Sequence, residues 1–149
     1  MKAVLVRSRF VMLAALAVLI GCAGQPRFGT FVEVADSALR VVAVDAARRV
    51  EETWPAEQHR MHLSDAATDP FATALASELR RAGFRVFTQE AVPKGAVELH
   101  FAVDTLGDSG LLRVTLYVQQ SHWSRAYSNA GGKVSPAGPW TGFDTDGGR

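Results

Sequence analysis

The sequence predicts a single small α+β domain, in which two helices pack on a mainly antiparallel sheet of about four to five strands. Two segments carry apolar residues at helical spacing, and later segments alternate between apolar and polar residues as half-buried strands do. The chain has 149 residues, and removal of a 21-residue leader leaves 128, which suits one domain with a real core.

A basic head and a short apolar run open the chain. Lys2, Arg7 and Arg9 precede an uninterrupted apolar run over residues 10–20. These 11 residues are too few for a helix that spans a bilayer, which needs about 20. The pattern is that of a secretory signal peptide over residues 1–21.

Four residues close this leader, and the last of them is the only cysteine of the chain. Leu19, Ile20, Gly21 and Cys22 resemble the bacterial lipobox, whose cysteine is diacylated on sulfur, freed by a dedicated peptidase and acylated on its new amine. The resemblance implies peptidase recognition at the first three residues and lipidation at Cys22, where two or three acyl chains give a stable membrane anchor. A plain secretory signal and a retained membrane anchor are the alternatives.

The residue after the cysteine bears on location. An aspartate there is associated with retention at the inner membrane in lipoproteins of this kind, and this chain has Ala23. The resemblance therefore implies an anchor in the outer membrane rather than the inner one, with the domain facing the periplasm.

Charge argues against a nucleic-acid partner. The whole chain carries 16 basic and 15 acidic residues, but three of the basic ones lie in the leader. The remaining chain has 13 against 15, a net charge of −2, so we expect no direct contact with nucleic acid.

The mature chain divides into three parts by composition. Residues 22–30 are expected to form the acylated N-terminus and a short tether, and the eight residues 23–30 reach at most about 28 Å when extended. This length keeps the α+β domain, residues 31–143, close to its membrane. Residues 144–149 are expected to form a flexible tail.

Residues 32–54 carry one apolar stripe at steps of three and four residues, which predicts a long amphipathic helix. The stripe consists of Val32, Ala35, Leu39, Val42, Ala46 and Val50. Pro55 ends the helix, because the residue before a proline is pushed out of the α region. The charged residues off the stripe are interpreted as a solvated face.

A strand, a second helix and another strand are predicted next. Residues 61–63 form a short strand, and Asp69 and Pro70 supply an N-cap and a first helical position. Gly83 ends that helix, and residues 84–87 follow as a strand. This order suggests a small βαβ crossover.

The remaining strands are predicted to be antiparallel. Residues 97–103 and 112–118 alternate between apolar and polar positions, which predicts a hairpin with matched apolar faces around a turn at 107–110. A third strand is expected at residues 122–128, with residues 133–135 pairing back onto it.

The turn at residues 107–110 reads Gly-Asp-Ser-Gly, the four residues that surround the nucleophile of chymotrypsin-like proteases. Those enzymes need two β-barrels and a much longer chain, so a turn is the better interpretation.

The chain has four histidines, which we interpret as surface or structural residues rather than metal ligands: His59, His62, His100 and His122. We therefore expect no catalysis, metal, cofactor or small-molecule substrate, with a small periplasmic hydrolase as the minor alternative.

Aromatic residues are the candidates for contact with a partner protein. Tyr117, Trp123 and Tyr127 fall on polar or mixed strand faces, where exposed aromatics can mark a contact surface. The alternative is that the long helix covers this face. Trp140 is a further candidate, and it can also dock onto the domain together with Phe143.

An ordered set of short segments resembles a known family. The strings are FATAL at 71–75, LRRAGF at 79–84, DSGLLRVTL at 108–116, SRAY at 124–127 and PAGPW at 136–140. Together with the lipobox they are similar to TrbH, a conjugal transfer lipoprotein. The resemblance covers nearly the whole chain in matching order.

The resemblance implies a subunit of the mating-pair formation apparatus, a type IV secretion system that moves DNA between cells. Its implied partners are the membrane, through the lipid on Cys22, and other subunits of the secretion channel. The implied role is structural, and the family supplies no catalytic residues to transfer. The alternative is an outer-membrane lipoprotein that assists or regulates an envelope-assembly enzyme outside conjugation.

Overall fold

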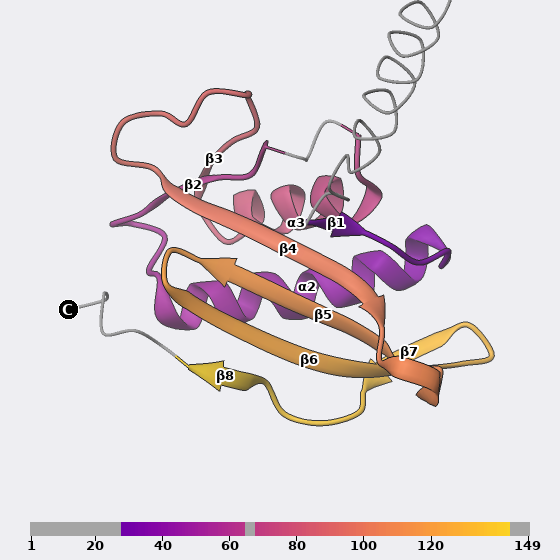
Figure 1. Cartoon of the computed structure of the whole chain (residues 1–149). Coiled ribbons are helices and arrows are strands. Elements are labelled where there is room, and N and C mark those ends of the chain that lie inside the picture. The colour runs from indigo at the N-terminus through magenta and orange to yellow at the C-terminus, as the bar shows by residue number, and fades with distance from the viewer. Residues whose placement is uncertain (1–27, 65–67, 144–149) are drawn as a thin grey trace, which may run out of the picture.

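The computed structural model describes residues 28–64 and 68–143, and Figure 1 shows their arrangement. Within these residues, two helices, α2 (Asp36–Thr53) and α3 (Pro70–Arg81), lie on the same face of one sheet. The α+β class and the two helices are confirmed. Neither helix is long and apolar enough to cross a bilayer.

The sheet contains eight strands among the described residues, ordered β3-β2-β4-β5-β6-β7, with β1 beside β4 and β8 beside β6. They are β1 (Gly29–Thr30), β2 (Arg60–His62), β3 (Arg85–Phe87), β4 (Val97–Thr105), β5 (Leu112–Val118), β6 (Ser121–Ala130), β7 (Lys133–Pro136) and β8 (Thr141–Phe143). The pairs β1–β4, β2–β3 and β2–β4 are parallel, and the others are antiparallel.

The expectation of four to five mainly antiparallel strands is therefore wrong, because the sheet is mixed and larger. Strands of two or three residues, such as β1 and β8, are too short to show an alternating pattern in the sequence.

Helix α2 begins four residues later than predicted. The amide of Phe31 still donates to the carbonyl of Val103 in β4 at 2.7 Å, and Ala35 has the extended conformation of an N-cap, so residues 32–35 precede the helix. Val32 still packs against the core, which explains why it fits the apolar pattern. The predicted end is confirmed, since the amide of Trp54 makes the last bond, to Val50, just before Pro55.

Helix α3 follows its predicted signals. A carboxylate oxygen of Asp69 accepts from the amide of Ala72 at 3.0 Å, and Pro70 occupies the first position. Gly83 adopts a φ of +96° after the last turn, which a side chain would disfavour. Since β2 and β3 are parallel neighbours, the crossover through α3 is confirmed.

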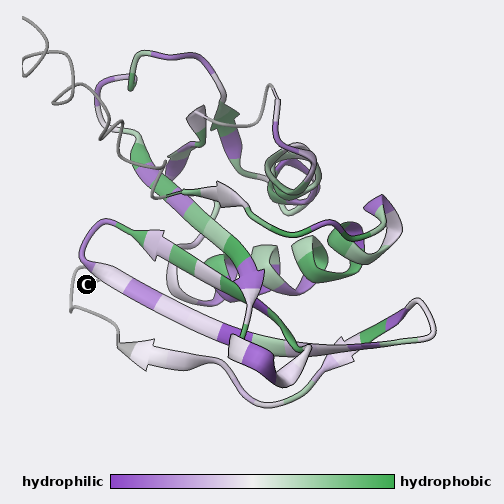
Figure 2. Ribbon diagram, turned by 45° about the vertical axis from the view of Figure 1, so that its right-hand side comes forward, coloured by the Kyte–Doolittle hydropathy of each residue, from purple (hydrophilic) through white to green (hydrophobic). Residues whose placement is uncertain are grey.

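The hairpin of β4 and β5 is also confirmed, with Leu99 opposite Val118 and Val103 opposite Val114. Its apolar positions face the helices, and β4 shows alternating hydrophobic and hydrophilic bands in Figure 2. The connection contains a short 3₁₀ turn, Gly107–Ser109, and Gly110 follows with a φ of +70°.

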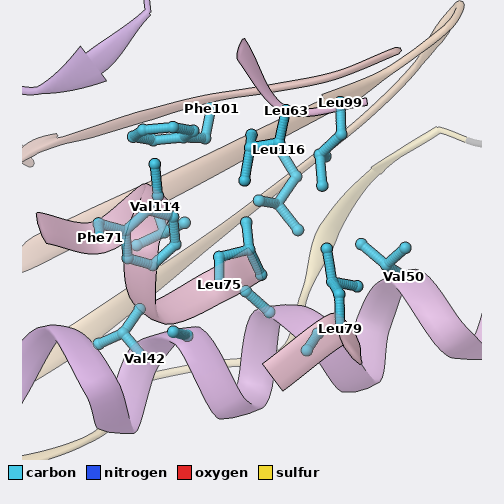
Figure 3. Close-up of a cluster of buried hydrophobic side chains, with 14 of the residues drawn as sticks. Val42, Val50, Leu63, Phe71, Leu75, Leu79, Leu99, Phe101, Val114 and Leu116 are labelled. Carbon is cyan, nitrogen blue, oxygen red and sulfur yellow. The ribbon is translucent and has the colours of Figure 1, made fainter. Parts of the chain in front are cut away.

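The core lies between the two helices and the sheet (Figure 3). Phe71 from α3 meets Phe101 from β4 with ring centroids 4.9 Å apart. Leu75 and Val42 complete this layer, and all of these side chains are fully buried. Packing of this kind supplies most of the stability of a small domain.

One boundary of the predicted domain differs from the structure. Gly29 and Thr30 were expected in the tether, but they pair with β4 opposite Ala102 and Val103. The folded domain therefore begins before residue 31. The leader, residues 22–27 and the tail at 144–149 lie outside the described residues, as does Cys22.

Candidate functional site

Two of the four aromatic residues expected at a contact surface are buried. Trp123 is 1% exposed and Tyr127 is fully enclosed, so a partner cannot reach them in the folded domain. In the register of β5 and β6 they lie opposite Leu116 and Leu112, on the face that α2 covers. Their predicted role as contacts is wrong, and the alternative, cover by the long helix, is what the structure has.

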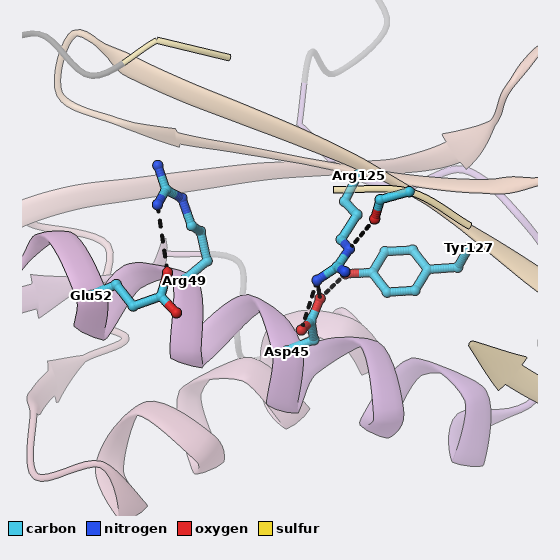
Figure 4. A network of polar contacts seen from close by, with 6 residues as sticks. Asp45, Arg49, Glu52, Arg125 and Tyr127 are labelled. Atoms are coloured by element: carbon cyan, nitrogen blue, oxygen red, sulfur yellow. Dashed lines mark hydrogen bonds and ion pairs between the residues drawn. The ribbon is translucent and has the colours of Figure 1, made fainter. Parts of the chain in front are cut away.

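A polar network joins α2 to β6 on the side of the sheet that the helices cover (Figure 4). Asp45 from α2 accepts two bonds from Nη1 of Arg125, at 2.8 and 3.1 Å, and one from the hydroxyl of Tyr127 at 2.6 Å. Nε of Arg125 also donates to the carbonyl of Gly138 at 2.7 Å. One carboxylate thus links the helix, the sheet and the segment after β7. We call Asp45, Arg125 and Tyr127 the α2–β6 network.

Burial raises the pKa of the Tyr127 hydroxyl well above its usual range, and the hydrogen bond to Asp45 adds to this effect. The phenol is therefore protonated and acts as a donor. A group held in this way stabilises the packing of α2 on the sheet, and it is poorly suited to exchange protons with a substrate.

A second cation lies against the same strand. The guanidinium of Arg49 lies 4.7 Å from the ring centre of Trp123, and it makes an ion pair with Glu52 at 3.5 Å. Stacking of this kind adds to the attachment of α2.

Trp140 and Tyr117 are the expected contact residues that keep some exposure. Trp140 packs against the core while its ring lies 5.9 Å from the guanidinium of Arg125. The expectation that this residue docks is confirmed, and β8 follows it directly by pairing with β6. Tyr117 lies on the side of β4–β6 opposite the helices, which we call the open face.

An aromatic cluster occupies one end of the open face. The ring of Phe28 stacks on His100 with centroids 4.5 Å apart, and it meets the edge of Tyr117 at 5.4 Å. His122 lies beside Tyr117 at 6.2 Å. Phe28 was not among the expected contact residues, although an aromatic residue inside a predicted tether indicates that the segment docks.

The rest of the open face is polar but nearly balanced in charge. Asp104 and Arg113 lie directly opposite each other and form a two-bond ion pair. The hydrogen bond to Asp104 raises the pKa of Arg113. Between this pair and the aromatic cluster, Thr115 and Ser124 share a hydrogen bond of 3.2 Å.

The histidines have structural surroundings. His62 is buried with Nε2 2.7 Å from the carbonyl of Gln89, and His59 lies against Trp54 with Nδ1 3.0 Å from the carbonyl of Pro55. Within the described ranges no group of three His, Cys, Asp or Glu residues is placed to hold a metal ion. In the turn, the Ser109 hydroxyl donates to the carbonyl of Leu106 at 2.6 Å, as a turn residue does.

The outer side of the helix pair contains a groove of about 670 Å³ between α2 and α3. Val41 and Val44 line it with 50% and 43% exposure, and Arg40, Glu78 and Arg81 are among the charged residues around it. Val41 and Val44 are not part of the predicted apolar stripe of this helix. Apolar residues outside that stripe are the feature of the sequence that indicates an exposed apolar surface here.

Comparison with known proteins yields one match. The family model described as "Conjugal transfer protein TrbH" matches residues 25–144, which includes the whole described domain. No curated protein and no solved structure matches the chain.

Proposed function

The chain belongs to the TrbH family of conjugal transfer proteins, and we propose that it is a periplasm-facing lipoprotein subunit of a conjugative type IV secretion apparatus. In this proposal Cys22 carries the lipid, and the domain contributes to assembly of the mating-pair channel. The observation that carries the proposal is the family match over residues 25–144, which begins three residues after the lipobox-like cysteine.

The leader supports the membrane anchor. Its basic head, short apolar run and Leu19–Ile20–Gly21–Cys22 ending are the order that a lipoprotein leader requires. Two or three acyl chains bury enough methylene groups for stable attachment. With Ala23 after the cysteine, we propose the outer membrane as the site of the anchor.

We propose that the domain acts by binding other subunits and not by catalysis. Its buried and half-buried charged side chains serve the fold, since Asp45 holds Arg125 and Tyr127, while Asp104 pairs with Arg113. Asp69 caps α3. Trp140 remains the aromatic candidate for contact with subunits.

Plasmid transfer between cells tests the proposal. Deletion of the gene in a donor strain should abolish or strongly reduce transfer, and the wild-type gene should restore it. The Cys22→Ser protein should fail to restore transfer, because it cannot be acylated. Ala23→Ser, which changes the neighbouring small residue and leaves the cysteine in place, is the matched control and should restore it.

Full transfer from the deletion strain would contradict the proposal. Photo-crosslinking in the donor envelope identifies the proteins that the domain touches, with the probe at Trp140 or in the α2–α3 groove at Val44. Capture of mating-pair subunits supports the proposal. Capture of an envelope-assembly enzyme instead supports the alternative role outside conjugation.

A further inference from the structure

We propose that the open face of the sheet lies against the phospholipid bilayer that carries the anchor. The inference rests on the proposed lipidation of Cys22, and it goes further by giving the domain one orientation on the membrane. The helices α2 and α3 then point away from the lipid, toward the periplasm. Two independent features of the domain lead to this orientation.

The first feature is the place where the chain enters the domain. Phe28 is held by stacking on His100 and by its edge contact with Tyr117, and both of these residues belong to the open face. Phe28 is therefore on that face, and it is the first described residue after the anchor segment.

The next residues are fixed just as firmly. Thr30 pairs with β4, its amide donates to Asp69 at 2.8 Å, and its hydroxyl donates to the same carboxylate at 3.0 Å. The described domain thus begins at Phe28, and the six residue steps from Cys22 to Phe28 can span at most about 21 Å. A tether this short, attached on the open face, keeps that face near the lipid.

The second feature is the distribution of charge. Over the middle of β4–β6 the open face presents small or hydroxyl-bearing side chains, namely Ala102, Thr115, Ser124, Ala126 and Ser128. Asp104 and Arg113 neutralise each other at one end, and Glu98 lies at the other margin. Phe28 and Tyr117 add apolar rings, and tyrosine also has a polar atom that suits the membrane interface.

The helix side is different. Its exposed residues include many charges, namely Asp36, Arg40, Arg48, Glu51, Glu52, Arg80 and Arg81. Charged groups lose hydration when they are pressed against lipid, which is costly unless each finds a partner. The nearly neutral open face, which is toward the viewer in Figure 1, is therefore the side that a bilayer favours.

Site-specific quenching by lipid tests the orientation. The full-length protein is purified from bacterial membranes and placed in vesicles of phosphatidylethanolamine and phosphatidylglycerol that contain brominated phospholipid. Acylation consumes the thiol of Cys22, so a second cysteine can be labelled alone with a fluorophore. The open-face variants are Thr115→Cys and Ser128→Cys, and the helix-side control is Arg48→Cys, an exposed position on α2.

We expect brominated lipid to quench the two open-face labels several-fold more than the label at position 48. Adding Phe28→Ala should reduce this contrast while the protein still floats with the vesicles, because it removes an apolar ring from the open face. Equal quenching at the three positions, or stronger quenching at position 48, would overturn the orientation. Ser128→Cys keeps the test decisive if Thr115→Cys disturbs the sheet.

Flotation separates the two proposals. A protein that floats with the vesicles in high salt but shows no difference in quenching retains its lipid anchor, and only the orientation is then wrong. A wild-type protein that fails to float has no lipid anchor, and both the anchoring and the orientation are then overturned.

Discussion

At the scale of single residues, Asp45 connects three parts of the molecule. Its carboxylate holds the Arg125 guanidinium of β6 and the Tyr127 hydroxyl, and Arg125 in turn holds the carbonyl of Gly138. The side chains of Asp45 and Arg125 are 19% and 20% exposed, so water can replace these bonds only in part. Loss of the carboxylate therefore has consequences beyond one bond.

Replacing Asp45 by alanine should lower the free energy of unfolding by about 2–3 kcal/mol, because it leaves Arg125 and Tyr127 without their partner. Urea unfolding of residues 23–149 measures this change. Glu52→Ala is the matched control on the same helix, where the partner of Arg49 is 57% exposed and the expected loss is within about 0.5 kcal/mol. Equal losses in the two variants would refute the role given to Asp45.

The raised pKa of Tyr127 predicts a loss of stability at alkaline pH. Because this pKa is higher in the folded chain, the phenol favours folding while it is protonated. Its contribution is complete below the ordinary tyrosine pKa of about 10 and is lost as the pH rises above that value.

The Tyr127→Phe variant checks this dependence through urea unfolding at a series of alkaline pH values. At neutral pH the free energy of unfolding of this variant should be about 1 kcal/mol below that of the wild-type protein. As the pH rises, it should also fall less steeply than in the wild-type protein, because the Tyr127 hydroxyl is absent. Tyr117→Phe, a change on the open face, should keep the decline of the wild-type protein. An unchanged alkaline decline in Tyr127→Phe would show that this hydroxyl is not the group responsible.

Strands β5 and β6 show which residue positions could be predicted from the sequence and which could not. Alternation correctly placed Tyr117 on the polar side of its strand, because β5 has four evenly spaced buried residues that define its faces. Strand β6 lacks such a pattern, since Arg125 lies between Trp123 and Tyr127 on the buried side. Its partner Asp45 is 80 residues away in the chain, so no local pattern could reveal the pair.

At the scale of elements, Asp69 couples the first strand to the second helix. One of its oxygens caps α3 through Ala72 and also accepts from the hydroxyl of Thr30, while the other accepts from the amide of Thr30. The cap was predictable from Asp69 and Pro70, whereas the bond to Thr30 was not, because 39 residues separate the two.

Two substitutions at Asp69 should separate these tasks. Asp69→Ala should cost about 1–2 kcal/mol and should speed amide exchange both at the start of α3 and in β1. Asp69→Asn keeps an acceptor for the cap but places an amide group beside the Thr30 amide, so only β1 should exchange faster. Hydrogen exchange measured by mass spectrometry distinguishes the patterns, and protection of β1 in both variants would contradict the coupling.

Strand β8 depends on a glycine. Gly142 has a φ of +145°, and a Cβ at this position would collide with the carbonyl oxygen of His122. Gly142→Ala should therefore detach β8 from β6, with a local cost of about 1–3 kcal/mol and faster amide exchange in residues 141–143. Gly138→Ala is the control, because no atom lies within 4 Å of its added Cβ, and unchanged protection of β8 in Gly142→Ala would contradict this account.

Repeated apolar spacing predicted the long elements, while the short strands β2, β3 and β7 were expected from their place beside a helix or a turn. Helices α2 and α3 and the hairpin of β4 and β5 have enough residues for a repeated apolar spacing, and α3 also has cap signals. The short strands β1 and β8 are fixed by contacts with distant strands instead. This is why the sheet is larger than the predicted four to five strands.

At the scale of the whole molecule, one carboxylate and one stacked ring connect the anchor segment to the body of the domain. Phe28 and β1 attach the start of the described chain to the sheet, and Asp69 joins β1 to the helix layer. The family was predictable from ordered segments along the chain, and the match over residues 25–144 confirms it. The anchor and the membrane that holds it rest on the leader and on Ala23, and these lie outside the described residues.

We propose above all that this TrbH-family domain works from a lipid anchor on Cys22. Mass spectrometry of the N-terminal peptide of the protein purified from cell envelopes tests it most directly. We expect a chain that begins at Cys22 and carries a diacylglyceryl group on sulfur and an acyl chain on the amine. A chain that still begins at Met1, or one with an unmodified Cys22, would contradict it.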